Sequence, residues 1–195
     1  MYEEYNDLLK NTLSEKRYIH SINVAKRAVE LAKINGFDEE KAELAGLLHD
    51  IMKCKSDDEL LTLLNSSEIK LDETEMLSPK IWHAPAGYLF VKNELHITDD
   101  EILNSVRYHT TGRANMSTLE KIIYLADLTS AERNYPNVEY VRELANKNLD
   151  EAMLYHLKFM ISDFSSKNIP ICKDTFFAYN CFAVLLNGGK NKVEK

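Results

Sequence analysis

Apolar residues recur at helical spacing along almost the whole chain. In residues 14–35, for example, Ile22, Ala25, Val29 and Ala32 form a stripe at intervals of three and four, the spacing of one face of an α-helix. No segment alternates apolar and polar residues with the period of two that marks a half-buried strand. The pattern therefore predicts an all-α bundle of about eight helices.

Capping residues predict where several of these helices begin and end. Ser14 and Asp38 each precede a predicted helix, and Gly36 suits the left-handed conformation that ends the first one. Pro85 fits the first turn of a helix over residues 84–95, because proline is tolerated there and not in a helix interior. Three capping-box patterns mark further starts: Ser56-x-x-Glu59, Thr98-x-x-Glu101 and Ser117-x-x-Glu120. Later helices are predicted over residues 138–146, 149–166 and 174–187.

Length and composition indicate one globular domain. The chain has 195 residues, of which 45% are hydrophobic and 28% charged, an ordinary balance for a soluble domain with a sizeable core. We expect a single domain over residues 1–195, with its core in residues 14–187 and a disordered tail in residues 188–195.

The net charge of −7 restricts the classes of partner. Nucleic acid and anionic membranes repel an acidic chain, so neither is an expected partner. A small anionic substrate stays compatible, because bound metals can invert the local field. Cys54, Cys172 and Cys181 form no disulfide pattern, and the sequence predicts no signal peptide and no membrane span. A reducing cytoplasm is the expected location.

Six side chains of the metal-ligand type lie inside predicted helices or at their ends. They are His20, His49, Asp50, His83, His109 and Asp127. Taken singly, several have a plainer explanation: His20 as a hydrogen-bonded interior histidine, His49 as a helix-end histidine, and Asp127 as a paired buried carboxylate. The other two histidines, His96 and His156, fit no site and are expected in a loop and in packing, respectively.

Taken together, the six side chains favour a metal centre. Neutral imidazole and carboxylate are ligands that divalent iron, manganese, cobalt or zinc accept when water must also bind. Six ligands are more than one metal needs if open positions are to remain, so they suit two metals that share a bridging carboxylate. Such a centre is typical of enzymes that hydrolyse phosphate esters.

The order His20, His49-Asp50 and Asp127 resembles the HD-domain superfamily of metal-dependent phosphohydrolases. His83 and His109, which lie between the HD pair and the last aspartate, resemble the additional ligands of its two-metal members. The surrounding sequence narrows the resemblance to the YqeK family, bacterial hydrolases that split diadenosine tetraphosphate symmetrically into two ADP. That similarity spans residues 18–186 and rests on LLHDIMK, WHAPAG, YHTTGR, YLADLTSAERNYPNVEYVRELA and DTFFAYN.

The resemblance implies a role for each ligand. In the implied arrangement, Asp50 bridges the two metals and belongs to the catalytic centre, where a metal-activated water attacks phosphorus. The first metal is held by His20, His49, Asp50 and Asp127, and the second by Asp50, His83 and His109. Iron is the metal expected from the resemblance, whereas the ligands alone also accept manganese, cobalt or zinc.

One position departs from the family pattern. The family often has an Ile-Glu pair soon after the last ligand, where this chain has Thr129-Ser130. Glu132 is the candidate to replace that glutamate in supporting the metal ligands.

Basic and polar residues near the ligands are candidates for contacts with the substrate. Lys53 lies four residues after His49, on the same face if the helix continues that far, and is a catalytic candidate that contacts a phosphate or assists the leaving group. Arg133 is a second catalytic candidate, because a guanidinium binds two phosphate oxygens at once. The candidate substrate contacts are Thr110, Thr111, Arg113, Arg133 and Tyr135, the last by stacking on a base. A solvated surface role is the alternative for each arginine. The alternative for Lys53 is an exposed lysine favoured by the dipole at a helix C-terminus, and for Tyr135 it is packing against the turn.

A symmetrical product implies an asymmetric site. Two ADP arise only if the cut falls between the second and third phosphates. We therefore expect one nucleoside diphosphate to be held firmly on one side of the metals, and the other half to lie in a more open groove.

Other functions fit parts of this pattern. A nucleotidase or cyclic-nucleotide phosphodiesterase of the same superfamily keeps the HD ligands, although single-metal nucleotidases do not need His83 and His109. A metal-bound nucleotide sensor could dispense with some ligands, and a helical interaction protein would make their order accidental. The expected partner is a small-molecule nucleotide, and the helices after Asp127 are candidates for a homodimer face.

Overall fold

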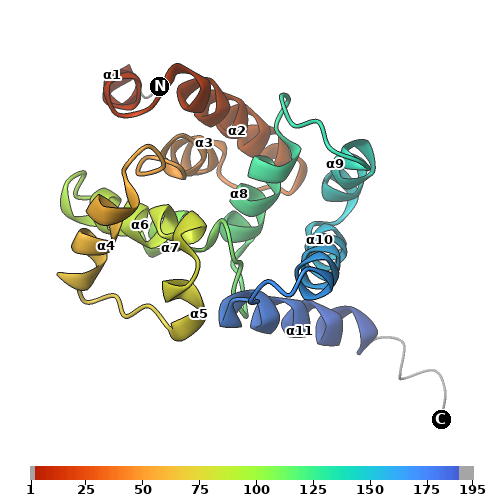
Figure 1. The fold of residues 1–195 in the computed structure, drawn as a ribbon. Coiled ribbons are helices and arrows are strands. Elements are labelled where there is room, and N and C mark those ends of the chain that lie inside the picture. Colours follow the sequence, from red (N-terminus) through yellow and green to blue (C-terminus); the bar gives the residue numbers. More distant parts are fainter. Residues whose placement is uncertain (1–2, 189–195) are drawn as a thin grey trace, which may run out of the picture.

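Helices make up nearly all of the computed structural model, which describes residues 3–188 (Figure 1). The α-helices are α1 Glu3–Thr12, α2 Glu15–Ile34, α3 Glu39–Leu48, α4 Asp57–Asn65, α5 Glu73–Met76, α6 His83–Asn93, α7 Asp100–Tyr108, α8 Thr118–Thr129, α9 Val138–Lys147, α10 Leu149–Ser166 and α11 Lys173–Asn187. A 3-10 helix, η1, covers Pro79–Ile81, and the described residues contain no strand. The predicted all-α class is confirmed, with more helices than predicted. Beyond Gly188, the predicted tail lies outside the described residues.

Most predicted helix starts are confirmed by side-chain caps. The side chain of Ser14 accepts a hydrogen bond at the start of α2, and Asp38 does the same for α3. Complete capping boxes begin α4 at Ser56 and α8 at Ser117. Gly36 has a φ of +63°, as expected for the residue that ends α2.

One local prediction is wrong. The box at Thr98 does not form, because the neighbouring Asp99 caps α7 instead, through the backbone N–H groups of Glu101 and Ile102. The condition on which Lys53 would share a helix face with His49 is not met, since α3 ends at Leu48 and turns follow.

The centre of the bundle is formed by α2, α3, α7 and α8. α2 packs against both α3 and α8, and α7 packs against α3, α6 and α8. Leu31, Leu48 and Ile122 are fully buried in this core. A Cβ on Gly46 of α3 would lie only 2.7 Å from Cα of Ala25 in α2, so only glycine permits this approach. The C-terminal end of α3 is thereby held against the middle of α2.

The outer helices extend the core at both ends of the chain. α1 was not predicted, yet Leu9 and Leu13 are buried in the core, which therefore begins before residue 14. At the other end, α10 packs against α8, α9 and α11. Figure 1 shows this group on the opposite side of the molecule from α4.

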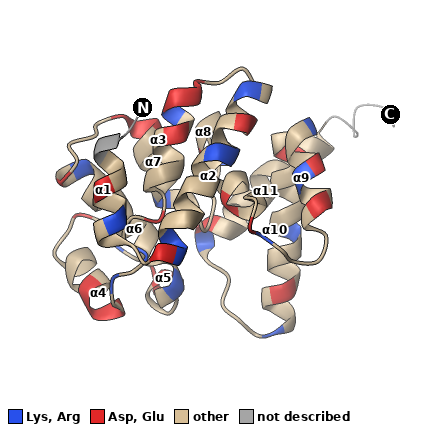
Figure 2. Ribbon diagram, turned by 90° about the horizontal axis from the view of Figure 1, so that it is seen from above, with Lys and Arg blue, Asp and Glu red and all other residues tan. Residues whose placement is uncertain are grey.

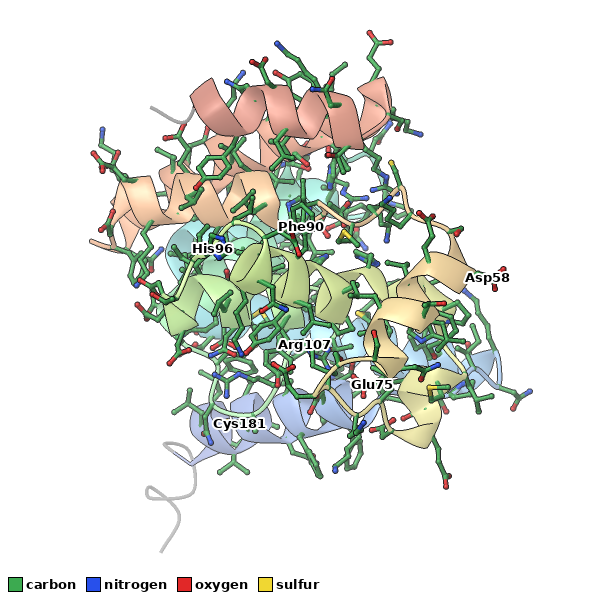
Figure 3. The ribbon with its side chains drawn as sticks, turned by 90° about the vertical axis from the view of Figure 1, so that its left-hand side faces the viewer. Asp58, Glu75, Phe90, His96, Arg107 and Cys181 are labelled. Carbon is green, nitrogen blue, oxygen red and sulfur yellow. The ribbon has the colours of Figure 1, made fainter. Side chains whose placement is uncertain are left out.

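A buried ion pair holds the segment that leads into α6. Arg107 of α7 lies 2.8 Å from Glu75 of α5, and both residues are buried (both labelled in Figure 3). The indole N–H of Trp82 donates to the backbone carbonyl of Glu75 at 2.8 Å. These contacts anchor the residue immediately before His83 to α7.

The surface charge is mixed. Basic and acidic residues are interspersed over the helices in the view of Figure 2. Among the residues that the structure describes, no helix is long and apolar enough to cross a membrane.

Candidate metal centre

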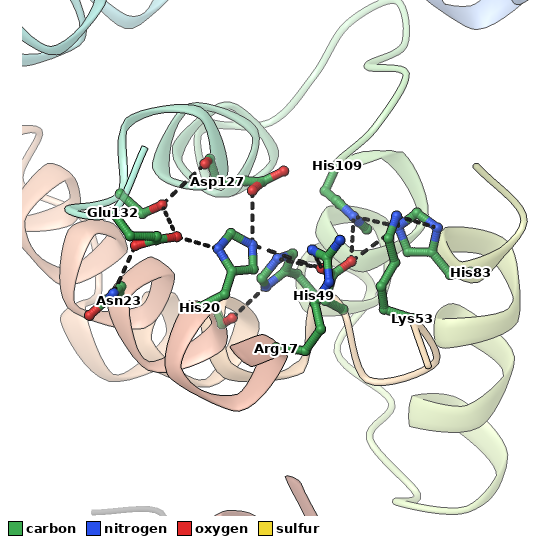
Figure 4. A network of polar contacts seen from close by, with 12 residues as sticks. Arg17, His20, Asn23, His49, Lys53, His83, His109, Asp127 and Glu132 are labelled. Atoms are coloured by element: carbon green, nitrogen blue, oxygen red, sulfur yellow. Dashed lines mark hydrogen bonds and ion pairs between the residues drawn. The ribbon is translucent and has the colours of Figure 1, made fainter. Parts of the chain in front are cut away.

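The six predicted ligands come together in one cluster (Figure 4). Five elements deliver them: α2 carries His20, the turn after α3 carries His49 and Asp50, α6 begins with His83, the residue after α7 is His109, and α8 carries Asp127 in its last turn. All are buried except Asp127, whose side chain is 19% exposed. Their ligand atoms form three overlapping groups, each spanning no more than 4.8 Å.

Asp50 occupies the middle of this cluster. Its Oδ1 lies 3.1 Å from Nε2 of His83 and 3.5 Å from Nε2 of His109. Its Oδ2 lies 3.8 Å from Nε2 of His20 and 3.7 Å from Nε2 of His49. The two carboxylate oxygens therefore face two different pairs of histidines, which is the arrangement of a carboxylate that bridges two sites.

The histidines are oriented by hydrogen bonds on the far side of their rings. Nδ1 of His49 donates to the carbonyl of Gly46 at 2.7 Å, and Nδ1 of His109 donates to the carbonyl of Val106 at 2.8 Å. A carbonyl can only accept, so Nε2 carries the lone pair that points into the cluster.

The cluster has unpartnered acceptors of the kind that bind metal. Nε2 of His49 is buried without a hydrogen-bond partner, which is costly unless something binds it. Nε2 of His20 also has no hydrogen bond of good geometry, and it lies 3.1 Å from Oδ1 of Asp127. Imidazole and carboxylate together suit iron, manganese, cobalt or zinc. The residues present therefore fit a divalent metal centre.

The electrostatics of the cluster keep four of its members in metal-binding form, namely His49, Asp50, His83 and Asp127. Burial lowers the pKa of His49 and of His83 to about 4, so both are neutral near pH 7. Burial alone would raise the pKa of Asp50 and of Asp127. The neighbouring histidines outweigh it, with Arg133 also acting on Asp127, and hold both pKa values below the usual range. Neutral imidazoles and ionised carboxylates are the forms that coordinate metals.

Glu132 contacts His20 on the side of the ring that faces away from the cluster. It is the candidate to replace the glutamate that the family often has where this chain has Thr129-Ser130. Nδ1 of His20 donates to Oε1 of Glu132 at 2.5 Å. Burial lowers the pKa of His20, but Asp127 and Glu132 outweigh it, so that the pKa is raised. A carboxylate in this position fixes the ring and strengthens the basicity of a metal-binding histidine.

Arg17 is a member of the site that the sequence did not reveal. Its guanidinium lies 3.1 Å from Oδ2 of Asp50. Arg17 sits on the first turns of α2, where a basic residue looks like an ordinary exposed one. Its closeness to Asp50 is a contact between α2 and the turn after α3, and these two helices pack closely at Gly46.

Arg133 and Tyr135 lie where substrate contacts were predicted. Arg133 donates to the carbonyl of Asp127 at 2.8 Å and is paired with its carboxylate. Both residues line a pocket of about 360 Å³, together with Arg17, His20 and Glu132. We refer to it as the Arg133 pocket. The hydroxyl of Tyr135 is buried there without a hydrogen-bond partner.

The loop residues predicted to touch substrate have other surroundings. Arg113 forms a two-pronged ion pair with the buried Glu120, at 2.5 and 2.9 Å, so its guanidinium is occupied by a carboxylate. The hydroxyl of Thr111 donates to the carbonyl of Gly112. The hydroxyl of Thr110 is buried without a hydrogen-bond partner. None of the three predicted residues lines the Arg133 pocket.

Lys53 reaches the cluster from the turns that follow α3. Its Nζ lies 3.2 Å from each ring nitrogen of His83. Burial lowers the pKa of Lys53. His96 and His156 stay outside the cluster, as predicted: His96 lies in the loop after α6, and Nδ1 of His156 shares a hydrogen bond with the Tyr124 hydroxyl at 3.0 Å.

The sequence profile of the HD domain matches residues 17–132. This range runs from Arg17 to Glu132 and contains all six clustered ligands. The chain belongs to the HD domain family. The family predicted from the order of the ligands is therefore confirmed.

Relatives of this HD domain protein extend the similarity beyond that range. A protein of Bacillus subtilis (strain 168) named "Bis(5'-nucleosyl)-tetraphosphatase, symmetrical" is 38% identical over 178 residues, which cover 91% of this chain and 95% of that protein. A protein of the same name from Halalkalibacterium halodurans is 42% identical over 175 residues, covering 89% of this chain and 92% of that protein.

A solved structure has the same fold. It is a predicted HD superfamily hydrolase involved in NAD metabolism from Clostridium acetobutylicum, 34% identical to this chain, with a TM-score of 0.91. The match covers 95% of this chain and 98% of that one. The helices after the HD profile therefore belong to the shared architecture.

Proposed function

We propose that this protein hydrolyses diadenosine tetraphosphate symmetrically into two ADP, at a centre of two divalent metal ions. The substrate class is a small-molecule nucleotide. Two observations support the proposal: relatives that align over about nine-tenths of the chain bear the name of that activity, and the chain has a buried set of six ligands.

The position of Asp50 carries the two-metal part of the proposal. One of its oxygens faces His83 and His109, and the other faces His20 and His49. If His20 and His49 bound the only metal, His83 and His109 would bind none. Their close approach, with Nε2 atoms 3.2 Å apart, favours a shared ligand between them.

Each metal would have its own ligand set. His20, His49, Asp50 and Asp127 would hold one, and Asp50, His83 and His109 the other. When bound, the metals supply Lewis-acid chemistry that activates water and neutralises phosphate oxygens. Iron is the first choice, with manganese, cobalt and zinc compatible with the same donors.

The chain itself contributes positive charge around this centre. Arg17 and Arg133 each contact an aspartate of the cluster and line the Arg133 pocket. Each guanidinium is engaged in part by its aspartate, and its remaining N–H groups can donate to phosphate oxygens. Tyr135 in the same pocket offers a ring for a base to stack on. We infer that one nucleoside diphosphate is held in the Arg133 pocket.

Lys53 lies beside His83, on the side of Asp50 that faces away from Arg133. Its Nζ lies against His83, and burial lowers its pKa. A lysine with a lowered pKa gives up a proton more readily than an exposed one. We propose that Lys53 binds the leaving phosphate and supplies a proton to it.

Hydrolysis of diadenosine tetraphosphate by anaerobically purified protein tests the proposal. We expect ADP as the sole nucleotide product and about two metals per chain on the same sample. His83→Ala should keep one metal and lose turnover. His96→Asn is the control, because it removes a histidine outside the cluster and asparagine tolerates the φ of +54° found there.

The other outcomes separate the rival functions. ATP plus AMP would place the cut at a different phosphate. Bound metal without turnover would indicate another nucleotide substrate or a sensor, and protein without any metal would contradict the metal centre itself.

A further inference from the structure

A second pocket borders the metal cluster on the side away from the Arg133 pocket. It has a volume of about 330 Å³ and is lined by Arg17, Lys53, Lys55, Asp57, Lys80 and His83, among others. We refer to it as the Lys80 pocket. Arg17 lines both pockets, while His20 lines only the Arg133 pocket and His83 only the Lys80 pocket.

The charge of the Lys80 pocket is suited to an anion. Four cationic side chains line it against a single carboxylate, that of Asp57, in a chain of net charge −7. Lys55 is paired with Glu59 at 3.0 Å. Arg17 is paired with Asp50 at 3.1 Å. Within the described part of the chain, neither Lys53 nor Lys80 forms an ion pair with a carboxylate. Ammonium groups that have no paired carboxylate and lie beside a pocket are typical of phosphate sites.

We propose that the Lys80 pocket binds the phosphates of the second nucleoside diphosphate half of the substrate. The inference rests on the proposed function and adds the location of the half that the Arg133 pocket does not hold. Asp50 lies between the two pockets. Its Oδ2 contacts Arg17, which lines both, and its Oδ1 faces His83, which lines the Lys80 pocket.

This arrangement explains why the cut is central. A tetraphosphate that spans both pockets would pass Arg17, which lines both of them. If each pocket takes two phosphates, the cut falls between the second and third. The position of the cut would then depend on both pockets and not on recognition of one end of the substrate.

The Lys80 pocket can be tested without disturbing the metal ligands. In the double variant Lys55→Gln, Lys80→Gln, two charges leave the pocket, and neither side chain contacts a predicted ligand. The control Lys33→Gln, Lys147→Gln makes the same change in net charge at two exposed residues that line neither pocket. Both proteins are loaded with Mn²⁺, and ADP binding is measured by calorimetry.

We expect two ADP per chain in the wild type and in the control, and one in the Lys55, Lys80 variant. For diadenosine tetraphosphate, KM should rise about tenfold in that variant, with kcat changed by less than about twofold, because uniform phosphate binding is lost. The increase of KM with salt should also be weaker than in the wild type.

Two results would contradict the second subsite, and a third would separate it from the proposed substrate. A wild type that binds one ADP, or a Lys55, Lys80 variant that behaves as the control does, overturns the second subsite. If the wild type fails to hydrolyse diadenosine tetraphosphate but binds two ADP, and the variant binds one, the phosphate pocket stands and the proposed substrate falls.

Discussion

At the scale of single residues, the hydrogen bond between Glu132 and His20 has a direct consequence for metal binding. Loss of a carboxylate that orients a ligand histidine weakens metal affinity by about 10- to 100-fold. Glu132→Gln keeps an oxygen acceptor but removes the charge, so we expect Mn²⁺ to bind about tenfold more weakly. Competition with a chelator measures this affinity.

Asn23→Ala provides the matched control for that experiment. The amide of Asn23 donates to the other oxygen of Glu132 at 2.8 Å, while the bond to His20 stays in place. Affinity should therefore stay within about twofold of the wild type. Equal weakening in both variants would mean that Glu132 acts through the local fold and not through His20.

A second residue-scale prediction concerns His156, which is outside the metal cluster. Burial lowers its pKa to about 4, whereas an unfolded histidine titrates near 6.5. Because the folded pKa is the lower one, the unfolded chain binds a proton first as the pH falls. The stability that His156 contributes is therefore complete above about pH 6.5 and is lost as the pH falls toward about 4.

His156→Gln isolates this effect from that of the carboxylates. Between about pH 7.5 and about pH 5, the free energy of unfolding of the wild type should fall by about 2 kcal/mol more than that of the variant. Urea unfolding at the two pH values measures the difference. The same decrease in both proteins would show that the fold does not lower the pKa of His156.

Single residues also show what the sequence could predict about the site. The ligands could be predicted because each is a histidine or aspartate that lies within an apolar helical segment or at its end. His49-Asp50, which follow LAGLL, are an example. Arg17 was missed because nothing near it in sequence is unusual. Its role depends on a contact across 33 residues of sequence, through the close packing of two helices.

At the scale of elements, four helix starts were predicted at the correct capping residue. They are Ser14, Asp38, Ser56 and Ser117. Two neighbouring residues can each cap at Ser56-Asp57, Thr98-Asp99 and Ser117-Thr118. The sequence does not decide between them, and at Thr98-Asp99 it is the second residue that caps. The four-residue α5 was missed because its capping box begins with Asp72 and encloses too short a segment for a helical period.

One helix, α9, holds the segment that carries Glu132 and Arg133. Arg142 of α9 donates to the backbone carbonyls of Thr129, Ser130 and Arg133 at 3.1, 2.8 and 2.8 Å. A lysine cannot supply donors to three carbonyls in fixed directions. Arg142→Lys should therefore lower the free energy of unfolding by about 2 kcal/mol and weaken Mn²⁺ binding as the loss of Glu132 does.

Glu139→Gln is the control for Arg142. It removes the ion pair between α9 neighbours and leaves the three carbonyl contacts intact. Stability and metal affinity should then stay close to wild type, since exposed pairs contribute little. If Arg142→Lys lowers stability without changing metal affinity, α9 braces the fold but does not position the site.

At the scale of the whole molecule, the metal centre is also a junction of the fold. Its ligands come from α2, α6, α8 and the turns after α3 and α7, and two buried imidazole nitrogens there have no hydrogen-bond partner of their own. The general class of this bundle followed from its periodicity. Which helix ends meet could not be read from it, because a period of 3.6 fixes the face of a helix and not its neighbour.

This junction predicts that metal binding stabilises the entire domain. A ligand at 100 times its dissociation constant adds about 2.7 kcal/mol per site, and each kcal/mol raises the melting temperature of a chain of this size by about 2–4 °C. With Mn²⁺ in that excess, the chelator-treated wild type should gain about 10–20 °C if both sites fill.

The variant His83→Ala separates the contribution of each site. It lacks a ligand of only one proposed metal, so about half of the increase in melting temperature should remain, whereas Asp50→Ala, which removes the shared ligand, should lose nearly all of it. Differential scanning calorimetry before and after metal addition measures both. If no divalent metal changes the melting temperature of the wild type, the buried histidines are held by the fold alone. The six side chains would then not form a metal centre.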